Sequence, residues 1–218
     1  MPRTITVKGV GQVSTRPDQI VLTLNTTAAE KDYDGTMEKA SRQSEAMTDA
    51  VKAAGFAAED LKTTHFNVST SYESIRDRDG NYRQVFAGYQ CSQGFRLAFP
   101  LEMPRLGQVL SAIAAAGAQP ELHIAFTVKD PAAISAALLQ NAAANARQKA
   151  EVLCAAAGTK LGQLISIDYS WNDINVTSRT RLETADCMPK LAAGCFRAEM
   201  TPEDIETSDS ATFLWEME

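Results

Sequence analysis

The chain has 218 residues, of which 44% are hydrophobic and 22% charged, and its formal net charge is −6. This is enough apolar material to bury a core as one large domain or two small ones. The acidic balance argues against nucleic acid as a partner, because nucleic-acid-binding proteins carry a basic stripe. No stretch approaches the roughly 18 apolar residues of a membrane-spanning helix, so we expect no membrane span.

The first two segments are predicted to be strands. Residues 4–13 alternate, and one face carries Ile5, Val7, Gly9, Gly11 and Val13. The sequence STRPD at 14–18 is typical of a turn, and a second alternating run starts at Ile20. Together these features predict a β-hairpin.

Gly9 and Gly11 lie two residues apart within the first strand. A dinucleotide-binding loop needs a third glycine followed by a helix, but here Ser14 takes that place and a strand follows. Glycine on the core face of a strand instead indicates the close approach of another element. We therefore expect a helix or an aromatic ring to cover these two glycines.

The middle of the chain combines a helix with two very long strands. Residues 33–54 have helical periodicity, and Gly55 is well placed to end that helix. Residues 62–75 and 82–99 alternate, and the turn sequence DRDGN stands between them. Strands of this length exceed the usual five or six residues. Either glycines at 88 and 94 bend the longer strand, or the hairpin projects and packs on another subunit.

The remaining elements complete an α+β pattern. They are a helix at 104–116, a strand at 122–128, a helix that Asp130 and Pro131 begin and Gly158 ends, strands at 163–171 and 209–217, and a long loop at 172–206. The order ββα-ββα-βα-ββ predicts a largely antiparallel sheet with helices packed on one face and a long protruding β-hairpin. We expect a single domain over 1–218, built from two ββα-type units at about 1–60 and 61–120 and a C-terminal βαββ part.

Several motifs together resemble one known family. They are the pattern G-x-G-x-V followed by Pro-Asp (Gly9, Gly11, Val13, Pro17 and Asp18), GYQCSQGFRL from Gly88 and Tyr89 onward, and NARQKAEVLCAAAGTKLGQLISI at 145–167. In this order and spacing they are similar to the SIMPL-domain family of bacteria, over nearly the whole chain. The resemblance implies an α+β protein, often periplasmic, that forms oligomers and is associated with stress tolerance. It brings no catalytic residues, and it has no motif for 172–206.

The residues themselves contain no known catalytic or cofactor motif, and we expect no cofactor and no metal. His65 and His123 are both out of phase with the core residues of their strands. They would form a shared metal or acid–base site only if the two strands were neighbours, and two separate surface histidines are the favoured interpretation. None of the four cysteines forms a C-x-x-C pair, although Cys187 and Cys195 could pair in an oxidising compartment.

Two functional hypotheses remain. The first is a non-enzymatic homo-oligomeric assembly or binding protein that uses the long hairpin for contacts with itself or with a protein partner. The second is a small-molecule-binding protein or enzyme that uses the 172–206 loop as a lid, because long loops often carry function. Its candidate residues are Arg179, Arg181, Asp186, Cys187 and Cys195. The start of the chain has no apolar signal-peptide core, which predicts a cytoplasmic protein as written, or a periplasmic or other extracytoplasmic one if a signal peptide has been removed.

Overall fold

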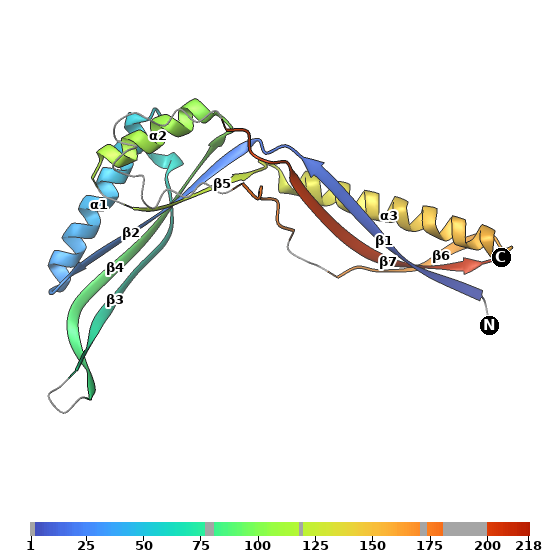
Figure 1. Cartoon of the computed structure of the whole chain (residues 1–218), viewed down its shortest axis with the longest axis horizontal. Helices are drawn as coiled ribbons and strands as arrows, with labels where there is room; N and C mark the ends of the chain where they lie inside the picture. Colours follow the sequence, from blue (N-terminus) through green and yellow to red (C-terminus); the bar gives the residue numbers. More distant parts are fainter. Residues whose placement is uncertain (1–2, 77–80, 118–119, 171–173, 181–199) are drawn as a thin grey trace. The chain divides into compact units, whose positions relative to one another are not determined.

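The computed structural model describes residues 3–76, 81–117, 120–170, 174–180 and 200–218. The elements of this part are, in chain order, β1 (Arg3–Thr15), β2 (Gln19–Glu30), α1 (Tyr33–Ala53), a 3-10 turn (Ala58–Asp60), β3 (Lys62–Arg76), β4 (Tyr82–Pro100), α2 (Met103–Ala115), β5 (Glu121–Thr127), α3 (Pro131–Ala156), β6 (Leu161–Asp168) and β7 (Ile205–Met217). This order confirms the predicted α+β fold (Figure 1).

The chain divides into two compact units, each with its own sheet. In the described residues, the first unit contains a three-stranded sheet of order β1-β7-β6, and the second a four-stranded sheet of order β3-β4-β2-β5. The pairs β1–β7, β6–β7, β2–β4 and β3–β4 are antiparallel. The single-domain organisation expected for 1–218 stays a prediction, and the two units are described separately below.

The prediction of a hairpin between the first two strands is wrong. β1 pairs along its whole length with β7, from Arg3 opposite Met217 to Thr15 opposite Ile205, whereas β2 pairs with β4. The polar groups at the predicted turn explain the difference. The Asp18 backbone N–H donates to the Thr127 carbonyl (3.0 Å), and the Asp18 carboxylate accepts from the Lys129 backbone N–H (2.7 Å). These bonds hold the segment between β1 and β2 against the end of β5 and the residues that follow it. β2 therefore does not fold back onto β1.

In the first unit, α3 lies along β1 and β7 (Figure 1). Its buried stripe has a four-residue spacing and consists of Leu138, Ala142, Ala146, Ala150 and Cys154. This stripe packs on Val7 of β1 and on the stacked rings of Phe213 and Trp215 of β7. The small alanine side chains let the helix backbone come close to the strand, which confirms the expected covering element over the two glycines of β1.

In the second unit, α1 packs on β2 and β4, and α2 packs on α1. The strands contribute a mostly apolar face, with Ile20, Leu22 and Leu24 on β2 and Phe95, Leu97 and Phe99 on β4. The buried polar residues Thr26 and Gln93 lie opposite each other on the same face. α2 buries Leu106, Val109, Leu110 and Ile113. The burial of these side chains supplies the main favourable free energy of this unit.

The helix ends follow the predicted local chemistry. The carboxylates of Asp32 and Asp130 accept hydrogen bonds from the backbone N–H groups of Gly35 (2.7 Å) and Ala133 (3.1 Å), which caps α1 and α3. Just beyond the ends of α1, α2 and α3, glycines with φ between +70° and +84° end the helices. The predicted stops at Gly55 and Gly158 are therefore confirmed.

β3 and β4 pair from Lys62 opposite Arg96 to Arg76 opposite Tyr82. β2 ends at Glu30, opposite Tyr89, so the part of β4 before Tyr89 pairs with β3 alone. Figure 1 shows this two-stranded segment continuing past the end of β2. We call it the distal hairpin, residues 71–76 and 82–88. The predicted turn at 77–81 lies mostly outside the described residues, and packing of the hairpin on another subunit stays a prediction.

Candidate functional site

A row of aromatic rings runs from the first residue of α1 onto the distal hairpin. The Tyr33 and Tyr89 ring centroids are 5.7 Å apart, those of Tyr89 and Phe86 5.4 Å, and those of Phe86 and Tyr72 6.0 Å, all in edge-to-face arrangements. Tyr82 lies on the same face, since it alternates with Phe86 along β4. We call these five residues the aromatic face. Edge-to-face ring pairs contribute about 0.5–1.5 kcal/mol each beyond the area they bury, so the contacts within the row favour this arrangement of the rings.

A β-bulge places these rings on one side of the hairpin. Ser71 pairs with Gly88 and Tyr72 with Phe86, so Ala87 is the extra residue and the alternation of β4 shifts by one. Tyr89 shares its side of the sheet with Cys91, which is buried against Ala40 of α1. Because of the bulge, Phe86 and Tyr82 continue that side beyond the helix. The aromatic face is thus an extension of the face that α1 covers.

The side chains of the aromatic face are largely exposed. The exposed fractions are 57% for Tyr72, 48% for Phe86 and 73% for Tyr82. On the opposite side of the distal hairpin, Ile75 and Val85 are also exposed. A contiguous apolar surface of this kind on a two-stranded ribbon is typical of an interaction site.

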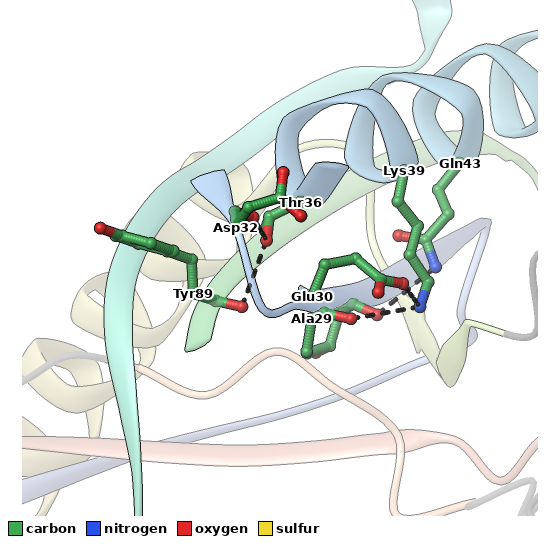
Figure 2. A network of polar contacts seen from close by, with 8 residues as sticks. Ala29, Glu30, Asp32, Thr36, Lys39, Gln43 and Tyr89 are labelled. Carbon is green, nitrogen blue, oxygen red and sulfur yellow. Dashed lines mark hydrogen bonds and ion pairs between the residues drawn. The ribbon is translucent and has the colours of Figure 1, made fainter. Parts of the chain in front are cut away.

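A polar network joins α1 to the end of β2 and to Tyr89 in the middle of β4, where the distal hairpin begins (Figure 2). The Thr36 hydroxyl donates to the Asp32 carbonyl (2.8 Å) and lies 3.4 Å from the Tyr89 carbonyl. The Lys39 ammonium donates to the Glu30 carboxylate (2.8 Å) and to the Ala29 carbonyl (3.3 Å). This network fixes the position from which the aromatic face extends.

Gly88 allows β4 to pass the end of β2. Its φ is +144°, and a Cβ atom there would overlap the Glu30 carbonyl oxygen. Glycine is the residue that combines this backbone conformation with so close an approach. Gly88 and Tyr89, both predicted as motif residues, therefore lie together where the distal hairpin begins.

A polar pocket of about 520 Å³ lies on the first unit. Its lining includes Gln12, Ser14, Arg179, Glu206 and Ser208, so one basic and one acidic side chain face a space with several hydroxyl and amide groups. Of the loop residues proposed from the sequence, Arg179 is therefore in a pocket. Arg181, Asp186, Cys187 and Cys195 lie outside the described residues.

The other predicted motif residues have structural positions. Gly9 and Gly11 lie under α3, and Pro17 is buried beside Asp18, whose hydrogen bonds hold the end of β1. His65 is on β3 and His123 on β5, at opposite edges of the four-stranded sheet, so they form no shared site. Within the described residues, no cluster of three or more His, Cys, Asp or Glu side chains is arranged to hold a metal ion.

Among the residues that the structure describes, two groups have raised pKa values. The Tyr169 hydroxyl donates to the Asp209 carboxylate (2.8 Å), and this hydrogen bond raises the pKa of Tyr169 above its ordinary value. Asp209 is only 7% exposed, so the bond satisfies a carboxylate that is largely buried beneath α3. Burial raises the pKa of the Cys91 thiol, which favours its protonated and unreactive form.

Comparison with known proteins identifies the family. A family model described as "SIMPL: Protein of unknown function (DUF541)" matches residues 5–213, which is nearly the whole chain. The chain belongs to the SIMPL family. The resemblance seen in the sequence motifs is therefore confirmed.

Two curated proteins are similar to this SIMPL chain. Both are named "26 kDa periplasmic immunogenic protein", one from Brucella melitensis biotype 1 and one from Brucella abortus strain S19. Each is 28% identical over 169 residues, which cover 76% of this chain and 66% of the relative. The match thus spans just under two thirds of the relatives' length. None of the described helices is long and apolar enough to cross a bilayer.

Sequence reasoning missed the aromatic face of this SIMPL chain. The alternation of 82–99 placed Tyr89 correctly, but strict alternation puts Phe86 on the other side of the strand. The only local signal was Gly88, since an isolated glycine within a strand often accompanies a bulge. The contact between Tyr33 and Tyr89 joins a helix N-terminus to a distant strand, which no periodicity reveals.

Proposed function

We propose that this protein is a non-enzymatic assembly protein that forms homo-oligomers, with the distal hairpin of one copy packing against a second copy. The observation that carries the proposal is the aromatic face, which continues a buried sheet face past the first residue of α1. Where α1 covers this face, its side chains form part of the hydrophobic core. Beyond Tyr33 nothing in the described part of its unit covers it.

The composition of the hairpin supports a second copy as the partner. Ile75 and Val85 on the side opposite the aromatic face are flanked by Glu73 and Arg83, so a small apolar surface carries one group of each charge. A surface with both charges around an apolar centre is suited to meeting a copy of itself. The link to stress tolerance that the resemblance implied stays a prediction.

Light scattering coupled to size-exclusion chromatography tests this proposal. We expect the intact chain to elute as a discrete oligomer at micromolar concentration. A chain with Tyr72→Ser and Phe86→Ser, or one with a shortened tip at 76–84, should give a smaller species with an unchanged far-UV spectrum. Val152→Ser is the matched control, because Val152 is 63% exposed on α3, in the other unit. A monomeric intact chain, or an oligomer that the hairpin changes leave intact, would contradict the proposal.

The polar pocket favours a second candidate function, the binding of a small zwitterionic molecule. Arg179 would pair with a carboxylate of the ligand and Glu206 with an ammonium group, while Ser14 and Ser208 offer hydroxyl groups. Thermal-shift screening with amino acids and short peptides tests it. A stabilisation that Arg179→Ala abolishes would support this candidate, and no shift with any of these ligands would leave it without support.

We propose a periplasmic location, on the strength of the names of the two relatives. Fractionation of the source cells with antibody detection tests this. Recovery in the osmotic-shock fraction is expected, and recovery only with the cytoplasmic proteins would contradict it.

A further inference from the structure

β6 is an unusually exposed and apolar edge strand. It lies at one edge of the three-stranded sheet, paired with β7 on one side. Leu164, Ile165 and Ile167 are 48%, 47% and 55% exposed. α3 packs on β1 and β7 and touches β6 little, so the helix leaves the edge of this sheet uncovered.

The opposite edge of the same sheet is closed. The Asn145 side-chain oxygen accepts from the Val10 backbone N–H (3.1 Å), and the Asn141 amide donates to the Gln12 carbonyl (3.0 Å). One helical turn further along, the Lys149 ammonium lies 3.3 Å from the Lys8 carbonyl and donates to it. Side chains spaced four residues apart on α3 thus occupy backbone groups on the outer edge of β1. Such groups would otherwise recruit another strand.

Edge strands of natural proteins are usually protected by charged side chains. Residues 161–167 of β6 contain no charged residue, but Lys160 and Asp168 stand at its two ends. Both are exposed, and neither has an ion-pair partner within the described residues. The strand therefore has opposite charges at its ends and uncharged, mostly apolar residues between them. When two copies of this strand run antiparallel, each charge lies beside the opposite charge of the other copy.

We propose that β6 pairs antiparallel with β6 of a second copy about a two-fold axis at Leu164. This register places Lys160 opposite Asp168 of the second copy at both ends. It places Leu161 opposite Ile167 of the second copy. The inference rests on the self-association proposed above, and adds to it a strand-to-strand contact separate from the distal hairpin.

The irregularities of β6 fit this register. Relative to β7, β6 has extra residues between Leu161 and Leu164 and again between Leu164 and Ser166. A bulge leaves the extra residue of its strand unpaired and bends that strand. Here the extra residues lie on both sides of Leu164. A two-fold axis at Leu164 therefore places the irregular segment of one copy opposite the irregular segment of the other, so the outline of β6 is compatible with a second β6 in this register.

The two copies would join into one six-stranded sheet with both α3 helices on the same side, because the axis is perpendicular to the sheet. Leu164 is opposite Trp215, whose side chain is buried on the α3 side of the sheet. Each α3 leaves the outer edge of its own sheet uncovered. The two Leu164 side chains would lie together in the space between the two helices. Pairing would thus bury apolar surface and satisfy edge backbone groups in one contact.

Disulfide trapping tests the register directly. In full-length chains with Cys187→Ser and Cys195→Ser, the thiols of Cys91 and Cys154 are buried, so an introduced cysteine is the reactive one. We expect Leu164→Cys to form a disulfide-linked dimer in mild oxidant, because the axis brings that position against itself. Val152→Cys, which is more exposed, is the control. Cross-linking of Leu164→Cys no faster than that of Val152→Cys would overturn the proposal.

Charge reversal provides a second, independent readout. Lys160→Glu or Asp168→Lys alone places like charges together at both ends of the contact, and should lower the cross-linking rate of Leu164→Cys at least several-fold. The double reversal restores opposite charges and should recover the rate. Absence of this recovery would overturn the register.

The same trapping experiment in the chain with a shortened hairpin tip separates the two proposals. If cross-linking persists while the large oligomer is lost, both contacts exist and are distinct. If the oligomer is unaffected by the tip but Leu164→Cys cross-links, the hairpin proposal fails and the β6 contact stands. If the tip change dissolves the oligomer and Leu164→Cys does not cross-link, the β6 contact fails and the hairpin proposal stands.

Discussion

Gly9 lies directly beneath the backbone carbonyl of Ala142, so close that a Cβ atom on the glycine would overlap that oxygen. Gly11 has the same relationship to Leu138, one helical turn earlier on α3. The two glycines therefore set the distance between β1 and the helix that covers it. The G-x-G pattern of this chain serves helix-on-sheet packing.

We expect Gly9→Ala to destabilise the protein by about 3 kcal/mol, because the added methyl group meets backbone atoms that cannot move aside as a side chain would. Urea denaturation followed by circular dichroism measures the change. Val10→Ala on the same strand is the control and should cost less than about 1 kcal/mol, since Val10 points away from the helix. Equal effects of the two changes would show that the close approach does not limit packing.

Asn145 should protect the outer edge of β1. Asn145→Ala removes the acceptor of the Val10 N–H, and that amide should exchange with deuterium about fivefold faster, the factor that corresponds to a hydrogen bond of ~1 kcal/mol. Hydrogen exchange with mass spectrometry or NMR detection measures it. Asn145→Asp retains the acceptor oxygen and should behave like the unmodified chain. An unchanged exchange rate in Asn145→Ala would argue against the edge-capping role.

The pair of Tyr169 and Asp209 predicts a dependence of stability on alkaline pH. Because the pKa of Tyr169 is raised in the folded chain, the folded state holds this proton more tightly than the unfolded state does. The stabilisation is complete below the ordinary tyrosine pKa of 10.0 and is lost as pH rises through the higher folded value.

Thermal midpoints measured from pH 8 to pH 11 check this dependence. The intact chain should lose more stability over the range than Tyr169→Phe, which has no proton to lose at this position. Tyr169→Phe should itself be less stable at pH 8, since it leaves the largely buried Asp209 carboxylate without its hydroxyl donor. Parallel pH profiles for the two chains would contradict the role assigned to the pair.

The N-cap of α3 should contribute measurably to stability. Asp130→Ala removes the acceptor for the Ala133 N–H and should cost about 1 kcal/mol in urea denaturation. Asp130→Asn keeps an acceptor oxygen and should cost much less. If both changes were neutral, Pro131 at the first helical position would be sufficient to start the helix.

The local structure of this chain was largely predictable. Alternation and helical periodicity placed the strands and helices in the correct order, and the ends of the helices followed from Asp130, Gly55 and Gly158. The same patterns indicated that Gly9 and Gly11 lie under another element. These features depend on residues close in sequence, whose backbone preferences and periodicity act over a few positions.

The partners of the strands were decided by tertiary structure. Alternation shows which side of a strand is buried but not which strand lies beside it. β1 therefore looked like the partner of β2, although it pairs with β7, about 200 residues away. The aromatic face depends in the same way on the bulge at Ala87, which exists only because β3 pairs with β4 in a particular register. Strand register, bulges and the Asn145 contact with β1 arise from long-range packing, and only the folded chain brings those residues together.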